Sequence, residues 1–290
     1  MTSTSPELLG EHACFGGKQR FYRHDSTQIG LPMRFSVFLP PQARIDAAGG
    51  KVPALIYLAG LTCNEETFMA KAGAQRLAAE LGLALIAPDT SPRGANVPGE
   101  TDSWDFGVGA GFYLDATQAP WSKNYRMESW ITAELLPLLT ATLPIDAGRI
   151  GIFGHSMGGH GALTLALRHP GLFKSVSAFA PICAPSQCPW GRKVFTGYLG
   201  ADESDWPDHD ATALMQHQPI APYPGGILID QGLSDKFLAD QLHPELFEAA
   251  CASAGQPLTL RRHAAYDHGY YFIASFMAEH LAHHARQLRV

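Results

Sequence analysis

Short apolar runs alternate along the chain with longer amphipathic segments. A near-continuous apolar run is typical of a strand covered on both faces, and a longer segment with apolar residues on one side is typical of a helix. The predicted buried strands are 53–59, 83–87 and 150–153, and further strands are predicted at 175–180, 226–230 and 258–262. Residues 34–39 alternate as a half-exposed strand. The predicted helices are 65–81, 126–143 with a kink at Pro137, a helix that ends at Arg168, 242–254 and 270–288.

Strands that alternate with helices predict a mainly parallel, doubly wound sheet with helices on both faces. No linker, low-complexity run or repeat divides residues 1–290, so we expect a single domain. Residues 1–30 are polar and turn-rich, with a tight turn at Phe15-Gly16-Gly17. Long loops are expected at about 89–122 and 181–224. The first of these is rich in aromatic residues, which favours an ordered and functional loop.

Composition and charge exclude several classes of function. The chain is 46% hydrophobic and 17% charged, as in ordinary globular proteins. The N-terminus lacks the basic start and apolar core of a signal peptide, and no apolar run approaches the ~20 residues that span a membrane. The odd number of cysteines, five, then predicts reduced thiols in the cytoplasm. The net charge of −6 without a basic cluster argues against a nucleic-acid partner.

One serine motif follows a predicted buried strand and leads into a glycine-rich helix. It reads Gly154-His155-Ser156-Met157-Gly158, with Gly159 and Gly161 just beyond. Gly-x-Ser-x-Gly alone is a weak signal, and an incidental serine in a turn is the simpler alternative. Glycines are needed here because the serine backbone is strained and larger side chains would collide across so tight a turn. In this context the motif predicts the nucleophile elbow of an α/β-hydrolase fold, with Ser156 as nucleophile.

A serine nucleophile needs a general base, and the base needs an orienting acid. In this fold the acid and then the histidine follow the serine along the chain. Asp235 lies in the loop after strand 226–230 and is the predicted acid; a helix cap is its simpler alternative, and Asp230 is the runner-up for the acid. His268 lies between the last strand and the last helix and is the predicted base. His263 is closer to the strand and is expected at the surface.

Neither a metal nor a nucleotide is expected. His155 and His160 flank the serine, but no carboxylate or cysteine accompanies them at zinc-ligand spacing. The string 107–111 is rich in glycine, yet it follows no strand and lacks the spacing of a dinucleotide fingerprint. Three histidines of the last helix are expected to form a solvated helix face: His280, His283 and His284.

The tetrahedral intermediate of acyl transfer needs two backbone N–H donors. One is expected from Met157, which follows the serine, and the other from Leu61 in the turn after strand 53–59. Cys63 lies in the same turn and is a competing nucleophile, which would work with a histidine. We favour a small buried thiol there, because free cysteine is usually buried.

Long motifs distributed over the chain carry a family resemblance. They are 58–63, 87–94, 103–107, 110–113, 124–127, 153–162, 180–183, 188–191, 197–200, 266–268 and 270–273. On these motifs the chain resembles the S-formylglutathione hydrolases, also called esterase D, over nearly its whole length. Ala59 and Gly269 depart from the family pattern, which usually has serine at both positions.

The resemblance implies an enzyme that hydrolyses S-formylglutathione to formate and glutathione in formaldehyde detoxification, without a cofactor and as a homodimer. It implies these roles: a triad of Ser156, Asp235 and His268, an oxyanion hole of Leu61 and Met157, and a site-adjacent thiol, Cys63. The formyl group is tiny, so the loops around Trp104 and Trp190 are expected to close a narrow acyl pocket, unless these rings pack in the core. Arg93 and Lys71 are candidates for binding the glutathione carboxylates.

Three other functions compete with this interpretation. A carboxylesterase for short acyl esters would use the same residues, so the sequence separates it poorly. An acyltransferase would need an acceptor site that outcompetes water. A binding protein that kept the fold would be expected to lack part of the triad, and here all three positions are intact.

Overall fold

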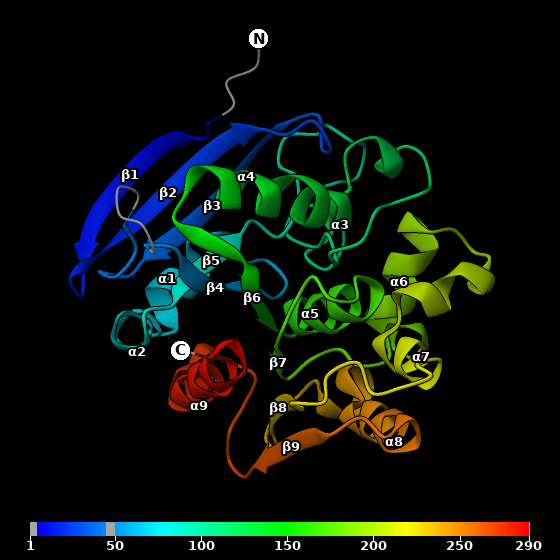
Figure 1. The fold of residues 1–290 in the computed structure, drawn as a ribbon. Coiled ribbons are helices and arrows are strands. Elements are labelled where there is room, and N and C mark those ends of the chain that lie inside the picture. Colours follow the sequence, from blue (N-terminus) through cyan, green and yellow to red (C-terminus); the bar gives the residue numbers. More distant parts are fainter. Residues whose placement is uncertain (1–4, 45–49, 290) are drawn as a thin grey trace.

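The computed structural model describes residues 5–44 and 50–289, so the first four residues discussed above lie outside the described part. Within this part the strands form one nine-stranded sheet in the order β1-β2-β3-β5-β4-β6-β7-β8-β9 (Figure 1). The strands are β1 (Glu7–Cys14), β2 (Gly17–Asp25), β3 (Pro32–Leu39), β4 (Val52–Leu58), β5 (Ala84–Pro88), β6 (Ile145–His155), β7 (Val176–Phe179), β8 (Ile227–Gly232) and β9 (Leu258–His263).

The six strands from β4 to β9 are mutually parallel, and β1, β2 and β3 join them antiparallel beside β5. The predicted mainly parallel sheet is therefore confirmed. β4 and β6 pair so that Leu58 lies beside Gly154. The turn after β4 and the turn after β6 consequently meet at the same edge of the sheet.

The N-terminal hairpin differs from the expectation of a polar, turn-rich segment. Residues 1–30 contain β1 and β2, joined at the predicted tight turn, where Phe15 and Gly16 have φ of 46° and 75°. β1 is largely exposed, so its sequence lacks the apolar alternation of a half-buried strand. Gly17 must be glycine, since an added Cβ would lie 2.2 Å from the carbonyl oxygen of Leu39.

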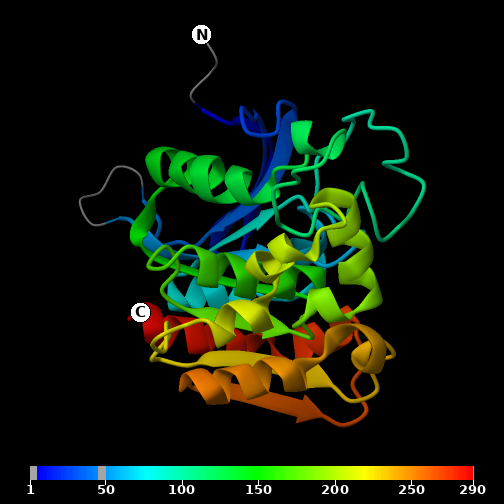
Figure 2. The same ribbon diagram turned by 90° about the vertical axis from the view of Figure 1, so that its right-hand side faces the viewer.

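Helices cover both faces of the sheet (Figures 1 and 2). α1, α2 and α9 lie on one face, and α4, α5 and α8 lie on the other. The helices are α1 (Thr67–Lys71), α2 (Gln75–Leu81), α3 (Met127–Ser129), α4 (Leu136–Thr142), α5 (Met157–Arg168), α6 (Pro189–Tyr198), α7 (Ala211–Gln216), α8 (Pro244–Ala254) and α9 (Tyr270–Leu288). None of the described helices is long and apolar enough to cross a membrane.

Two predicted helices are interrupted in the structure. The segment 65–81 divides into α1 and α2 around Gly73, whose φ of 68° is left-handed. The segment 126–143 contains a π-helical stretch, Trp130–Leu135, before α4. Pro137, the expected kink, is the second residue of α4 and follows directly on this π-helical stretch, within a segment that is helical from Met127 to Thr142.

The two long excursions differ from one another. Residues 89–120 are irregular but ordered, with Phe112 and Tyr113 fully buried. Residues 181–224, expected as a long loop, instead contain α6, α7 and two 3-10 helices, Pro185–Gln187 and Glu203–His209. Short helices of this kind carry few turns of apolar periodicity, which is why the sequence pattern missed them.

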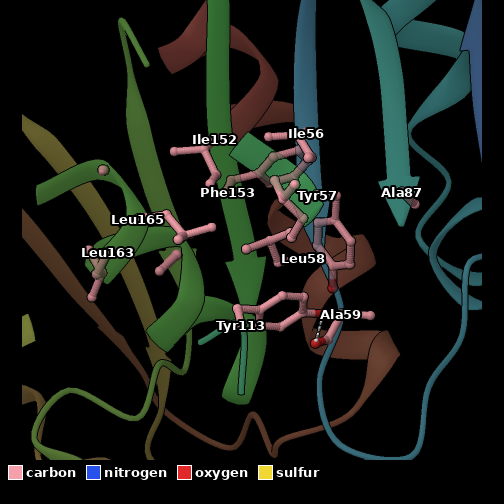
Figure 3. Packing of buried hydrophobic residues seen from close by; sticks show 14 of the residues in the cluster. Ile56, Tyr57, Leu58, Ala59, Ala87, Tyr113, Ile152, Phe153, Leu163 and Leu165 are labelled. Atoms are coloured by element: carbon pink, nitrogen blue, oxygen red, sulfur yellow. Dashed lines mark hydrogen bonds between the residues drawn. The ribbon is translucent and has the colours of Figure 1, made fainter. Parts of the chain in front are cut away.

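The central core lies between β4, β6 and α5 (Figure 3). Ile56 and Tyr57 of β4 and Ile152 and Phe153 of β6 are completely buried. Tyr57 and Phe153 pack against Phe68 of α1 on one face of the sheet, and α5 covers the other face with Leu165. Burial of side chains of this size stabilises the fold by about 1.5–3 kcal/mol each. The strands that lead into the site are thus held by fully buried side chains.

The three histidines of α9 are buried, so the expected solvated face is wrong. His280 and His284 are fully buried, and Nε2 of His283 lies 3.0 Å from the carbonyl oxygen of Val176. Spacing of i, i+3, i+4 marks a shared helix face, which can face either water or the sheet. Here the sheet offers partners in Ser175 and Ser177 of the β7 region.

These side chains form a continuous chain of hydrogen bonds. Ser175 Oγ lies 2.6 Å from His284 Nδ1, and Ser177 Oγ lies 2.8 Å from both His284 Nε2 and His280 Nδ1. His280 Nε2 lies 3.2 Å from Asp230 Oδ2. If each serine hydroxyl donates to a histidine Nδ1 and each of the two rings donates from Nε2, every donor in this series of hydrogen bonds has one acceptor. Buried polar groups must be paired in this way, so the chain fixes α9 on the sheet.

Candidate active site

The predicted elbow is present between β6 and α5. Ser156 has φ of 57° and ψ of −118°, a strained conformation for a residue with a side chain. An added Cβ on Gly158 would lie 1.9 Å from the carbonyl oxygen of Leu58, and one on Gly154 would lie 2.2 Å from that of Gly158. The glycines thus permit the close packing that holds Ser156 at the tip of the turn.

Asp235 and His268 form the hydrogen-bonded pair that the sequence predicts. Asp235 lies in the loop after β8 and His268 lies between β9 and α9, and Oδ2 of Asp235 is 2.5 Å from Nδ1 of His268. The other carboxylate oxygen accepts the backbone N–H of Phe237 at 2.8 Å. Gln231, which the sequence analysis did not single out, donates from Nε2 to Oδ2 at 3.2 Å. The carboxylate is therefore fixed in one orientation, and it orients the imidazole.

Ser156 and His268 face a common small pocket of about 130 Å³. The pocket also contains the predicted oxyanion residue Leu61 and the thiol of Cys63. Its full lining is Gly60, Leu61, Cys63, Trp104, His155, Ser156, Trp190, Phe237, His268 and Tyr270.

Asp230, the runner-up for the acid, has other partners. It is fully buried at the end of β8 and forms an ion pair with Arg261 at 2.5 Å and a contact with His263 at 3.2 Å. Burial alone would raise the pKa of Asp230, but the hydrogen bonds from His280 and Arg261 outweigh it and hold that pKa below its usual range. His263, expected at the surface, is largely buried against this cluster. Asp230 thus stabilises the sheet rather than the pocket.

The two predicted oxyanion donors lie on the two turns that meet at the sheet edge. Met157 is the first residue of α5, where a backbone N–H has no partner within the helix. Leu61 lies in the turn after β4, and this turn is held by a hydrogen bond from Thr62 N to Gly109 O at 2.9 Å. Leu61 and Ser156 line the same pocket, and Met157 directly follows Ser156, so the oxyanion role of the two N–H groups stays a prediction.

The glycine-rich string 107–111 supports this turn, a role that the sequence did not reveal. An added Cβ on Gly109 would lie 3.1 Å from Cα of Thr62. Just beyond, the hydroxyl of Tyr113 donates to Ala59 O at 2.8 Å (Figure 3). The same ring fills the space where Gly161 has no side chain. The ordered loop 89–120 thus positions the oxyanion turn by long-range contacts.

Cys63 faces the pocket as a partly buried thiol. Burial raises the pKa of this thiol, which disfavours the thiolate that a cysteine nucleophile requires. Its backbone carbonyl accepts hydrogen bonds from Thr90 Oγ1 at 2.6 Å and Arg93 Nη2 at 3.1 Å. Cys63 therefore belongs to the pocket wall.

Aromatic rings form the remaining wall. Trp104 and Trp190 meet edge to face with centroids 5.6 Å apart, and Trp190 packs against Phe237 at 4.7 Å. Phe237 in turn contacts the ring of His268 at 5.0 Å. Trp190 is 7% exposed but Trp104 is 55% exposed, so Trp104 is not a core residue. Both tryptophans lie where the sequence analysis expected the acyl pocket to close.

The histidines beside the elbow do not form a metal centre. His155 lies in the pocket wall, and His160 is buried between Phe112 and Phe195. Burial lowers the pKa of both rings, to about 3 for His160. In the described ranges no group of three or more His, Cys, Asp or Glu side chains is arranged to hold a metal ion.

Comparison with known proteins places the chain in a family. The model of the Esterase family matches residues 26–283. The S-formylglutathione hydrolase of Mus musculus is 54% identical over 284 residues, which are 97% of this chain and 98% of the mouse protein. The chain belongs to the S-formylglutathione hydrolase family. The family member from Paracoccus denitrificans is 52% identical over 97% of this chain and 98% of its own length.

A solved structure of the S-formylglutathione hydrolase from Agrobacterium tumefaciens has the same fold. Its TM-score is 0.92 at 47% identity, and the match covers 97% of this chain and 99% of that one. The resemblance and the α/β-hydrolase fold predicted from the sequence are therefore confirmed. As a member of the S-formylglutathione hydrolase family and of the Esterase family, the protein is a hydrolase.

Proposed function

We propose that the protein hydrolyses S-formylglutathione to formate and glutathione through a formyl-Ser156 intermediate, as a step of formaldehyde detoxification. The names of the full-length relatives from mouse and Paracoccus denitrificans support the substrate. The observation that carries the mechanism is that His268, hydrogen-bonded to Asp235, shares with Ser156 a pocket of only about 130 Å³. A pocket of that size suits a very small acyl group.

In the acylation step His268 accepts the proton of the Ser156 hydroxyl while Oγ attacks the formyl carbon. The N–H groups of Leu61 and Met157 stabilise the resulting oxyanion. Collapse breaks the carbon–sulfur bond, and the departing glutathione sulfur takes the proton from the imidazolium of His268. Asp235 stabilises that imidazolium and keeps its ring oriented without taking the proton.

In the deacylation step a water molecule replaces glutathione. His268 removes a proton from the water as its oxygen attacks the formyl carbon of formyl-Ser156. The second tetrahedral intermediate is stabilised by the same two N–H groups and collapses to formic acid, which loses its proton to solvent to give formate. The proton on His268 returns to Oγ of Ser156, which restores the free enzyme.

The pocket wall gives the proposed preference for a formyl group its physical basis. Trp104 and Trp190 leave little room beside Ser156 for an acyl chain. A longer acyl group would have to displace these rings, whereas the formyl group presents only a hydrogen atom. Short-chain ester hydrolysis is a side activity that the same pocket would allow.

The test is the value of kcat/KM on S-formylglutathione, S-acetylglutathione and a short-chain aryl ester. We expect a strong preference for the formyl thioester. Similar values on all three would contradict the proposed substrate and leave a hydrolase of small acyl esters. Ser156→Ala, measured in parallel, checks that the same site performs each reaction.

A further inference from the structure

A second, polar pocket of about 460 Å³ lies at the same edge of the sheet as the catalytic pocket. It lies where β5 ends and the antiparallel strand β3 begins, beyond the carboxyl ends of the parallel strands, where ligands bind in such folds. Its lining carries both positive and negative charges. The lining residues are Arg23, Pro32, Met33, Arg34, Asn64, Glu65, Asp89 and Arg93.

The distance between the two pockets follows from the strand order. β5 and β6 are separated only by β4, so the residues that follow them, Asp89 and Ser156, lie about 10 Å apart in the sheet direction. Cys63 connects the pockets, because its side chain lines the catalytic pocket while its carbonyl binds Arg93, which lines the second one. A small peptide can therefore contact both.

Two charged groups of this pocket are available for a ligand. Across residues 5–44 and 50–289 no ion pair is formed by Arg34 or by Glu65. Arg34 is exposed at the start of β3, and Glu65 is only 4% exposed. Burial and the nearby Asp89 raise the pKa of Glu65, so a cation beside it would be stabilising.

The other charges of the pocket are already paired. Arg93 forms two hydrogen bonds with Asp89, at 2.7 and 2.8 Å, besides the one to Cys63 O. Arg23 pairs with Glu7 at 2.6 Å. Arg93, a candidate for binding glutathione in the sequence analysis, therefore acts as a structural link. Lys71, the other candidate, lies over the ring of Tyr270 at 5.7 Å and does not line this pocket.

We propose that this pocket binds the α-amino acid end of the γ-glutamyl residue of the substrate, with Arg34 on its α-carboxylate and Glu65 on its α-ammonium group. Seven bonds join the cysteine sulfur of glutathione to the α-carbon of its γ-glutamyl residue, about 9 Å when extended, so that end reaches the pocket while the sulfur remains beside Ser156. Arg34 and Glu65 line the same pocket without an ion pair in the described part of the chain, and their opposite charges match those of this zwitterion. Guanidinium binds carboxylate with two parallel hydrogen bonds. The inference rests on the proposed function.

Two thioesters that differ only at the γ-glutamyl residue test this site. One is S-formylglutathione, and the other is S-formyl-N-acetylcysteinylglycine, which keeps the formyl thioester and the glycine but lacks the zwitterion. We expect kcat/KM of the native enzyme to be about 10- to 100-fold lower on the truncated substrate, the range for lost charge-assisted hydrogen bonds.

The variants Arg34→Gln and Glu65→Gln assign the effect to the pocket. We expect Arg34→Gln to lower kcat/KM on S-formylglutathione about 10-fold, mainly through KM, with no change on the truncated thioester. Arg34 is exposed, so the variant is expected to fold. Arg286→Gln, an exposed arginine of α9 that does not line either pocket, is the matched control and should change neither value.

The possible failures are distinguishable. Equal losses on both substrates would give Arg34 a structural role and overturn the inference, as would no loss on either. A native enzyme that cleaves both thioesters equally well would also overturn it, while leaving the proposed reaction intact. Failure of the native enzyme to prefer S-formylglutathione over a short aryl ester would instead contradict the proposed function, and this inference with it.

Discussion

The imidazole rings of His155 and His268 lie against each other, with centroids 4.4 Å apart and planes tilted by 47°. His155 is buried, and its Nε2 has no hydrogen-bond partner in the described part of the chain. Burial and the neighbouring His268 keep the pKa of His155 well below its usual value. His155, which precedes Ser156 in the elbow, is therefore a neutral ring that packs against His268, the proposed base. Because it is neutral, it adds no repelling charge when His268 is protonated.

Replacing His155 should lower kcat more than it changes KM. We expect His155→Ala to lower kcat about 10- to 100-fold with little change in KM, because a small displacement of His268 misaligns it with Ser156. Steady-state kinetics on S-formylglutathione measure both constants.

His160→Ala is the matched control, since His160 is an equally buried ring of the same region but lies outside the pocket. It should lower the melting temperature and leave kcat nearly unchanged. If both variants lose the same fraction of kcat, the effect of His155 is one of general stability.

The choice of nucleophile is tested by a pair of variants. Ser156→Ala should lose about 10³-fold or more in kcat while it stays folded, because removal of the nucleophile leaves only binding and the oxyanion hole. Cys63→Ser should keep most of the activity, since its thiol is expected to be part of the pocket wall. Complete loss in a folded Cys63→Ser protein, with activity retained in Ser156→Ala, would make Cys63 the nucleophile.

Acid should destabilise the protein below about pH 6.5. Burial lowers the pKa of His283 to about 4, whereas an unfolded histidine titrates at about 6.5. The unfolded chain therefore binds more protons between these values, and stability falls as the pH drops from 6.5 to 4, by roughly 3 kcal/mol for this one residue. Urea unfolding at pH 7.5 and pH 5 measures the difference.

His283→Gln should reduce that pH dependence, because the variant has no ring to protonate. The exposed His12 of β1 provides the comparison, and His12→Gln should leave the pH dependence as in the native protein. An unchanged slope in His283→Gln would mean that other groups cause the acid loss.

The acyl pocket should widen when its exposed wall is removed. Trp104→Ala should raise kcat/KM on S-butyrylglutathione relative to S-formylglutathione by about 10-fold, since one or two methylenes gain room and each is worth about 0.8 kcal/mol when buried. Tyr271→Ala removes an exposed ring of α9 outside the pocket and should leave the ratio unchanged. A constant ratio in Trp104→Ala would show that this ring does not limit the acyl group.

The sequence best predicts those features that depend on the order of residues along the chain. The buried strands could be predicted because apolar runs are continuous there, and the positions of Ser156, Asp235 and His268 followed from their order relative to these strands. The structure brings all three together, with Asp235 on His268 and both Ser156 and His268 in one pocket. Their roles, like the cytoplasmic location and the homodimer, stay predictions.

What the sequence could not predict depends on contacts between distant residues. Tyr113 reads as one aromatic residue of a loop, and only the fold shows that it bonds to Ala59. The spacing of the histidines of α9 is the same for a buried and a solvated helix face. Whether they are buried depends on what packs against that face, here the sheet. Gln231 looks like a polar residue at a strand end, and its contact with Asp235 depends on the bend of the following loop.

The hydrogen-bonded chain from Ser175 to Asp230 also constrains how the protein is made. α9 supplies His280 and His284, yet the ribosome synthesises this helix after every strand of the sheet. A nascent chain that has reached β9 would have to bury Ser175, Ser177 and Asp230 without these partners. The polar centre of the sheet therefore gains its full set of hydrogen bonds only when α9 docks, so docking of α9 completes the fold.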